Sequence, residues 1–112
     1  MVKKLKKYEQ AILDILGEYA TIKYQNINGS NQLIVDKTHR RYQVVTIGWQ
    51  GQQFVHDCPM HFDIIDDKVW VQQNNTDWEV GDMLEERGVL KSDIVVGFLT
   101  PELRAYTKYA VA

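Results

Sequence analysis

The sequence contains a single cysteine, Cys58, and no long apolar run among its 112 residues. An intrachain disulfide is therefore impossible, which fits a reducing compartment. No segment approaches the roughly 18 apolar residues that a membrane-spanning helix requires. The basic N-terminus is followed by Glu9, Gln10 and Asp14 where a signal peptide would have its apolar region. A cytoplasmic protein with no membrane segment is expected.

Recognisable catalytic patterns are also missing: there is no glycine-rich phosphate loop, no Gly-x-Ser-x-Gly elbow and no nucleophile–base pair at a known spacing. Asp66 and Asp67 are adjacent carboxylates, but a predicted turn points them into solvent and not into a cleft. Cys58 stands among strand residues, which favours a small buried side chain over a nucleophile. A reactive thiolate would need a cationic neighbour, a role open to His56 or His61. No catalytic residue and no cofactor is assigned, and an enzyme is not the expected class.

The charge balance argues against autonomous binding to nucleic acid. The formal net charge is −2, whereas proteins that bind DNA alone neutralise phosphates with clustered cations. Two local clusters of cationic residues remain as candidate nucleic-acid contacts. Clusters of this kind are more often simply exposed to solvent. The candidates are Lys3, Lys4, Lys6 and Lys7 at the N-terminus, with Arg40 and Arg41 in a later loop.

Apolar residues at three- and four-residue steps, from Leu5 to Tyr19, predict an amphipathic N-terminal helix of about four turns. A polar linker of turn-forming residues is predicted at 25–31. Short strands are predicted at 33–36 and 42–49, with a turn at 39–41 between them. A further strand restarts at Phe54, and Pro59 predicts a bulge or an edge position in it.

Residues 61–65 and 68–72 are predicted to form a hairpin around Asp66 and Asp67. Alternation along its strands places two sets of side chains on opposite faces. The core set is Phe62, Ile64, Val69 and Val71. The other set is His61, Asp63, Trp70 and Gln72, a polar face with one exposed tryptophan. Large exposed aromatics are rarely left uncovered, so these four residues are the predicted interface, covered by another segment of the chain or by a second subunit.

The C-terminal third is predicted to supply further helices and one more strand. Thr76 and Glu79 have the spacing of a capping box and predict a helix that ends at Gly88. Residues 93–99 are interpreted as a strand rather than a turn of helix. Thr100 and Pro101 then predict a short helix, and residues 109–112 are apolar enough to pack down. The whole chain, 1–112, is predicted to be one α+β domain with a mostly antiparallel sheet.

One cluster has the side chains that metals prefer: His56, Asp57, Cys58, His61 and Asp63, of which His56, His61 and Asp63 are the candidate ligands. His61 and Asp63 project from the same side of a predicted strand. Their spacing matches no structural zinc pattern, which requires two close pairs of Cys or His. Half-exposed strand residues give the same pattern without a metal, so no metal is predicted, and these three residues are kept as the candidates.

Several blocks of the sequence resemble the XisI family, the fdxN element excision controlling factor proteins of cyanobacteria. They are Asp36-Lys-Thr-His-Arg-Arg-Tyr42-Gln, Gly48-Trp49, His61-Phe-Asp-Ile-Ile-Asp-Asp-Lys-Val-Trp-Val-Gln72, Asp93-Ile-Val-Val-Gly-Phe98 and the terminus Tyr109-Ala-Val-Ala. The resemblance implies a small accessory protein that serves a site-specific recombinase when a DNA element is excised during heterocyst differentiation. It also implies a companion, the XisH protein, and the family supplies no catalytic residues.

Two features depart from the usual family pattern. The loop of His39, Arg40 and Arg41 is cationic where the family is often acidic, and Asp66-Asp67 replaces a common Asp-Gly. A homodimer that acts through protein–protein contact is expected from three other features: the half-apolar sheet face around Trp70, the acidic charge balance and the missing catalytic pattern. Two alternatives stay open: direct DNA binding through the two cationic clusters, and a metal-dependent enzyme that uses His61 and Asp63.

Overall fold

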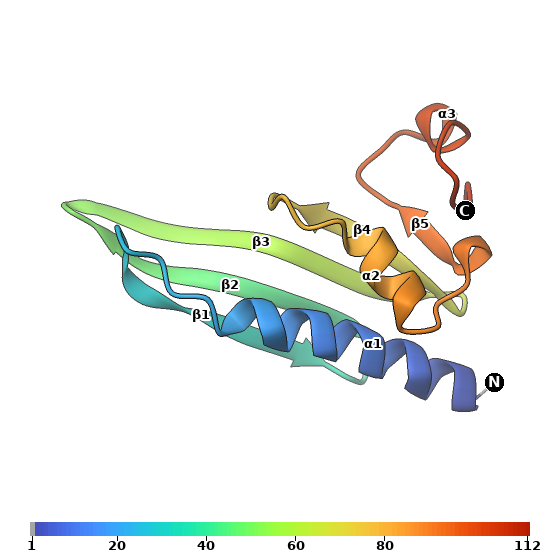
Figure 1. Ribbon diagram of the computed structural model, residues 1–112, viewed down its shortest axis with the longest axis horizontal. Coiled ribbons are helices and arrows are strands. Elements are labelled where there is room, and N and C mark those ends of the chain that lie inside the picture. The colour runs from blue at the N-terminus through green and yellow to red at the C-terminus, as the bar shows by residue number, and fades with distance from the viewer. Residues whose placement is uncertain (1) are drawn as a thin grey trace.

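A computed structural model describes residues 2–112, in which a long helix lies along one face of a five-stranded sheet (Figure 1). The elements are α1 (Val2–Ala20), β1 (Asn28–Asp36), β2 (Arg41–Gln50), β3 (Gln53–Ile65), β4 (Lys68–Asn74), α2 (Val80–Glu86), the 3-10 helix η1 (Lys91–Asp93), β5 (Ile94–Val96) and α3 (Pro101–Arg104). The strands follow the chain order across the sheet. Neighbouring strands from β1 to β4 are antiparallel. The predicted α+β class is therefore confirmed. Within residues 2–112, no helix is long and apolar enough to cross a membrane.

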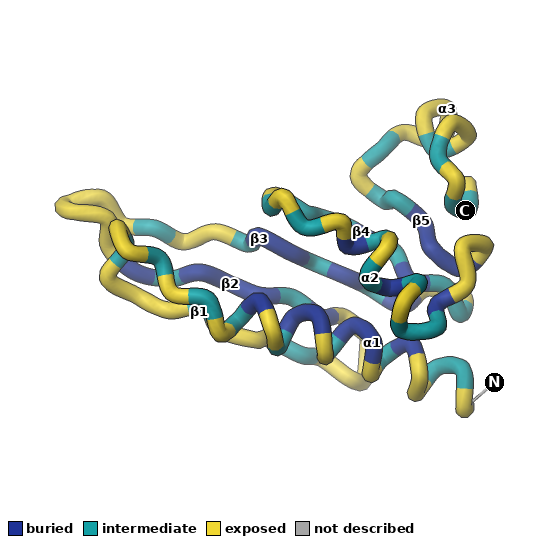
Figure 2. The backbone as a smooth tube through the Cα atoms, in the orientation of Figure 1, coloured by how far each residue is buried: buried dark blue, intermediate teal, exposed yellow. Residues whose placement is uncertain are grey.

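The core lies between α1 and the sheet, as the helical stripe predicts. Figure 2 shows the buried stretches of α1 facing the buried middle of β2 and β3. The helix contributes Tyr8, Ala11, Ile12, Ile15, Leu16 and Tyr19, and the sheet contributes Tyr42, Val44, Met60, Phe62, Ile64, Val69 and Val71. Val80 and Leu84 of α2 complete the same cluster. Burying one such side chain stabilises the fold by about 1.5–3 kcal/mol. The burial of the whole apolar stripe therefore stabilises α1 more than the helix propensity of any single residue does.

The hairpin of β3 and β4 forms at the predicted place. Ile65 pairs with Lys68, and the two turn residues between them have positive φ, 50° for Asp66 and 63° for Asp67. Positive φ at both turn positions is the geometry of a two-residue hairpin. The predicted faces are confirmed too, since the core set is buried and the other set is half-buried.

Pro59 lies at the predicted bulge. The register of β2 with β3 shifts between the pairs Val44–Met60 and Thr46–Asp57, so two residues of β3 oppose one of β2. Proline has no backbone N–H to donate to the hydrogen bonds between strands. At a bulge one residue is left unpaired, so no such donor is needed there.

The predicted polar linker at 25–31 is wrong in its second half, because β1 already begins at Asn28. Asn28 pairs with Trp49, and the neighbouring pair of Gly29 with Gly48 brings the two backbones into close contact. Asn31 also anchors the strand by its side chain, which donates to the carbonyl of Ile22 at 2.9 Å. Ladder pairing with a long partner strand overrides the local preference of these residues for turns.

The predicted capping box is wrong as well. α2 begins at Val80, and no side chain caps its first turn. Thr76 instead donates to the Asn74 side chain at 2.5 Å and accepts from the amide of Trp78 at 3.1 Å. Such local hydrogen bonds compete with helix formation, and here they hold Thr76 in a turn outside the helix. The predicted end of the helix is confirmed, because Gly88 has φ 92° in the turn that follows α2.

The C-terminal part differs from the prediction in extent. The strand predicted at 93–99 covers only Ile94–Val96 and pairs with β4 in parallel. After Val96 the chain turns back on itself, and the amide of Leu99 donates a hydrogen bond to the carbonyl of Val96 at 3.2 Å. The strand ends at this turn. α3 begins as predicted, with the Thr100 side chain accepting from the amide of Leu103. In the final segment, Ala110 bridges to Val95, whereas residues 111–112 are exposed.

Candidate functional site

The sheet has a second face, turned away from α1, which carries the predicted interface. Strand register assigns to it Asn28, Ser30, Gln32 and Ile34 of β1, the residues Arg41, Gln43, Val45, Ile47 and Trp49 of β2, Phe54, His56, His61 and Asp63 of β3, and Trp70 and Gln72 of β4. Arg41, a predicted nucleic-acid contact, is thus paired with Asp63 on this face. These side chains alternate with the core residues because successive side chains of a strand point to opposite faces. The helices α1 and α2 therefore leave this second face uncovered.

The four predicted interface residues lie together at one end of the second face. His61 Nε2 lies 2.8 Å from Asp63 Oδ1, and Gln72 Nε2 donates to Asp63 Oδ2 at 3.1 Å. Trp70 is paired with Asp63 across the strands. Both oxygens of the half-buried carboxylate thus have partners, so this end of the face is a satisfied polar cluster around one aromatic ring.

A residue that the sequence did not single out covers part of this cluster. The guanidinium of Arg104, from α3, lies over the Trp70 ring at 5.0 Å from its centroid. Arg104 also donates to the carbonyl of Val111 at 3.2 Å. The chain can turn onto Trp70 because Gly97 has no Cβ; one placed there would lie 2.4 Å from Gln72 Oε1. Part of the Trp70 ring is therefore covered by the chain itself. Contact with a second molecule at this end of the face stays a prediction.

The other end of the second face is apolar and exposed. Trp49 and Phe54 pair across β2 and β3, and their rings meet edge-to-face at 5.1 Å. Trp49 is 51% exposed and Phe54 53%, and the β1 residue opposite Trp49 is Asn28. The sequence analysis missed this pair. Alternate positions along β2 from Val45 place Ile47 and Trp49 on the same face, whereas Phe54 lies opposite Trp49 only through the pairing of β2 with β3.

The N-terminal lysines, predicted as candidate nucleic-acid contacts, are divided between two sides of α1. Lys6 lines a groove of about 290 Å³ together with Lys37 and Arg40 of the β1–β2 turn. Lys3, Lys4 and Lys7 line another groove beside Gly88 and Leu90, which follow α2. Lys4 Nζ is also bound to Asp93 Oδ2 at 2.8 Å, so its charge is already partnered.

The metal candidates do not form a site. His61 and Asp63 are in contact, but His56 lies farther along β3, opposite Ile47, whereas His61 lies opposite Gln43. Over the described part of the chain, no three His, Cys, Asp or Glu side chains are grouped to hold a metal ion. The two-residue step of a strand explains the His61–Asp63 contact without one.

Cys58 is a half-buried thiol, close to the predicted small buried side chain. Its sulfur lies 3.3 Å from the Met60 carbonyl oxygen and 3.5 Å from Gln43 Oε1, two acceptors within reach of its single S–H hydrogen. Burial raises the pKa of this thiol above its ordinary value, so the side chain stays protonated at neutral pH. A nucleophilic cysteine requires the opposite shift.

These features define a two-layer α+β protein with one sheet face packed under helices and one face open, polar at one end and aromatic at the other. A model of the XisI protein family matches residues 2–111, so the chain belongs to the XisI family. This confirms the resemblance drawn from the sequence.

Two solved structures from Anabaena variabilis are similar to this chain. One is a XisI-like protein, 40% identical, with a TM-score of 0.87 over 96% of this chain and 99% of that chain. The other is the fdxN element excision controlling factor XisI, 26% identical, with a TM-score of 0.83 over 97% of this chain and 99% of that chain. None of the curated proteins matches.

Proposed function

We propose that this protein is a controlling factor for excision of an fdxN-type DNA element, acting by protein–protein contact without catalysis of its own. The observation that carries the proposal is the similarity, over 97% of the chain, to the Anabaena protein named as that factor. The protein is proposed to act in the cytoplasm of a cyanobacterium during heterocyst differentiation. The proposed partners are an XisH-like companion and a site-specific recombinase.

The physical argument for protein contact begins with the open second face. Its exposed aromatic pair, Trp49 and Phe54, is the kind of side chain enriched in protein interfaces. The satisfied cluster around Asp63 supplies a polar rim beside it. The three side chains paired at the aromatic end, Asn28, Trp49 and Phe54, are uncharged, so they can meet their counterparts in a second copy without like-charge repulsion. The proposed free state is accordingly a homodimer built on this face.

A genetic complementation tests the excision role. A cyanobacterial strain that lacks its own XisI gene receives the present chain, and excision is followed by amplifying the rejoined DNA across the element. The chain is expected to restore the junction product. If an Anabaena XisI gene restores excision in that strain and the present chain does not, the proposed role is wrong.

Binding of the companion is tested separately by co-expression. The tagged full chain is expected to co-purify with an untagged XisH-like protein through size-exclusion chromatography. A companion that elutes alone under these conditions would contradict the proposed partnership.

One observation favours direct DNA binding as a second candidate function. Lys6, Lys37 and Arg40 converge on one groove, although the Glu9 carboxylate also lines it and lies 3.9 Å from Lys37. DNA binding through this groove requires affinity that falls steeply with salt, by a slope of about −0.9 per phosphate contact. No duplex binding at low salt, or binding unchanged when all three cations are replaced by Ala, would exclude this candidate.

A further inference from the structure

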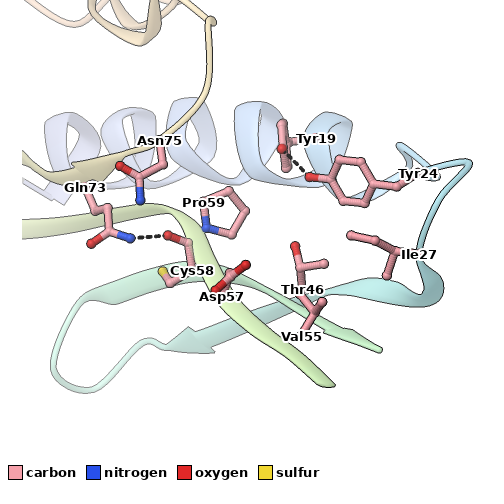
Figure 3. A pocket seen from close by; sticks show the side chains of 10 residues that line it. All are labelled: Tyr19, Tyr24, Ile27, Thr46, Val55, Asp57, Cys58, Pro59, Gln73 and Asn75. Carbon is pink, nitrogen blue, oxygen red and sulfur yellow. Dashed lines mark hydrogen bonds between the residues drawn. The ribbon is translucent and has the colours of Figure 1, made fainter. Parts of the chain in front are cut away.

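A groove opens between the end of α1, the segment that follows it and the bulged region of β3. Its volume is about 440 Å³, within the range of pockets that hold small ligands or single side chains. Its lining residues are Tyr19, Tyr24, Ile27, Thr46, Val55, Asp57, Cys58, Pro59, Gln73 and Asn75. In Figure 3, Tyr19, Tyr24 and Ile27 flank the space on the side of α1 and the segment after it, while Thr46, Val55 and Asp57 form its floor on the sheet.

The electrostatics of the groove favour a cation. Asp57 is its only carboxylate, and within residues 2–112 no lysine, arginine or histidine lines it. The groove lies at the C-terminal end of α1, where backbone carbonyls concentrate negative charge, and the last turn of this helix has no basic residue. Burial raises the pKa of Tyr19, as does its hydrogen bond with Tyr24, and the charge of Asp77 adds to the shift.

The uncharged walls suit a planar cation. The rings of Tyr19 and Tyr24 border the groove, and their hydroxyls are hydrogen-bonded to each other. The amide nitrogen of Gln73 donates to the carbonyl of Cys58, which leaves the Gln73 side-chain oxygen as an acceptor. A guanidinium stacks on aromatic rings and donates to a carboxylate and to amide oxygens at the same time. An ammonium is a compact point charge and lacks this combination.

We propose that this groove is a docking site for an arginine side chain of a partner protein, with Asp57 as the anionic contact. The inference rests on the proposed function, because it identifies where and how a protein partner binds. It places that contact on the helix side of the sheet, away from the second face. It also explains why an exposed carboxylate, at a pairing position opposite Thr46, faces a groove without a basic side chain.

A fragment titration on the full chain tests the site. Amide shifts are recorded by NMR while N-acetyl-arginine-N-methylamide is added, with the citrulline analogue as a neutral control of the same shape. The arginine compound is expected to bind in the millimolar range, about tenfold more tightly than citrulline, with shifts around Tyr24, Asp57 and Gln73. Equal binding of both compounds, or no shift with either, overturns the proposal. Tighter binding of free arginine than of the blocked form would identify a small-molecule site and overturn partner docking.

Matched variants make the test specific. Asp57→Asn keeps the shape of the side chain and is expected to weaken arginine binding at least about fivefold. Asp14→Asn removes the same charge from an exposed position on α1, outside the groove, and is expected to leave binding unchanged. Equal losses in both variants would mean a diffuse charge effect, and the site would be wrong.

The same Asp57→Asn variant, tested for capture of the XisH-like companion, separates this inference from the proposed function. Loss of the companion with an unchanged melting temperature supports docking through the groove. A companion that binds the variant as well as the unaltered chain overturns the inference and leaves the proposed function intact. If the unaltered chain captures no companion, the proposed partnership fails, and the claim of partner docking at this groove fails with it, whatever the fragments bind.

Discussion

At the scale of residues, a buried carboxylate links the two ends of the chain. Asp93, only 7% exposed, accepts a hydrogen bond from the Tyr8 hydroxyl at 2.5 Å and is paired with Lys4 at 2.8 Å. Burial by itself raises the pKa of Asp93, but the hydrogen bonds from Lys4 and Tyr8 outweigh it, so the net pKa lies below the ordinary value. The carboxylate is therefore ionised, and both partners are needed to keep it so.

Replacing Tyr8 by Phe removes one of these partners without changing the ring. The free energy of unfolding is expected to fall by about 1–3 kcal/mol, since a hydrogen bond to a buried charge is lost. Tyr106→Phe is the matched control, because Tyr106 is 87% exposed and its variant should unfold like the parent. Urea denaturation measures both, and equal stability of the two variants would contradict this account of Asp93.

The lowered pKa of Asp93 also predicts a dependence on pH. Its contribution to stability is fully present above the unfolded pKa, about 3.9, and is lost as pH falls through the lower folded value. The unfolding free energy should therefore drop below about pH 4, and Asp93→Asn should reduce this drop. Asp82→Asn is the control, since Asp82 pairs with Lys108 on the surface, where water screens the charges. Acid titration of the unfolding free energy would count against the assignment if Asp82→Asn had the larger effect.

At the scale of elements, two glycines occupy opposite environments. Gly17 lies inside α1, and an added Cβ would meet nothing within 4 Å. Gly48 lies in β2, where a Cβ would come within 2.5 Å of the Asn28 carbonyl oxygen on β1. The close approach of β1 to β2 thus depends on Gly48, whereas α1 gains nothing from its glycine.

Alanine at these two positions is expected to change stability in opposite directions. Gly17→Ala should raise the free energy of unfolding by about 0.5–1 kcal/mol, the propensity gain of alanine over glycine inside a helix. Gly48→Ala should lower it by about 1–3 kcal/mol, because the strands must move apart. Thermal melts of both variants provide the comparison, and a stabilised Gly48→Ala would mean that the strands are not in close contact there.

The β3–β4 hairpin carries local strain that a substitution can relieve. Asp67 has φ 63°, a left-handed conformation that favours glycine. Asp67→Gly is expected to raise the free energy of unfolding by about 0.5 kcal/mol, the balance of relieved strain and greater freedom in the unfolded chain. Asp67→Ala removes the same charge without the conformational freedom and should be less stable than the parent. If both variants are stabilised, charge rather than φ is responsible.

At the scale of the whole molecule, the proposed homodimer is tested by light scattering. We expect a dimer at micromolar concentration, held by the aromatic end of the second face. Trp49→Lys should shift the population to monomer, because an interface core disfavours a charge. Leu90→Lys is the control; Leu90 is 59% exposed and precedes η1, away from that face. A monomeric parent, or equal dissociation in both variants, would refute this assembly.

The sequence predicts those elements whose signals are local. The α1 stripe, the hairpin at Asp66-Asp67 and the bulge at Pro59 each follow from side chains a few residues apart. The predictions of secondary structure were wrong where contacts between residues far apart in the chain, or competing side-chain hydrogen bonds, decide the local conformation. Asn28 joins a strand because Trp49 lies opposite, against its own preference for turns. Thr76 has the spacing of a cap, but its hydroxyl donates to Asn74 and accepts from the amide of Trp78, and these hydrogen bonds hold it outside the helix.

The candidate sites divide in the same way. Strand alternation alone places Asp63 and Trp70 on one face, and the structure confirms it. The contact of Arg104 with Trp70 was not predictable, because the residues between them carry no signal of where α3 will lie. The groove beside Asp57 was not predicted either, because its walls come from α1, the segment after it and β3, which are far apart in the sequence.

By itself, the sequence determined the α+β class, the order of most elements, the two faces of the β3–β4 hairpin and the family. These follow from periodicity and from motifs that neighbouring residues carry. Only the tertiary structure decided that α3 turns onto the polar end of the second face, that its aromatic end stays open, and that a groove with one carboxylate forms at the end of α1. The reason is physical: a cover or a groove is made by segments far apart in the chain, and their meeting is decided by packing.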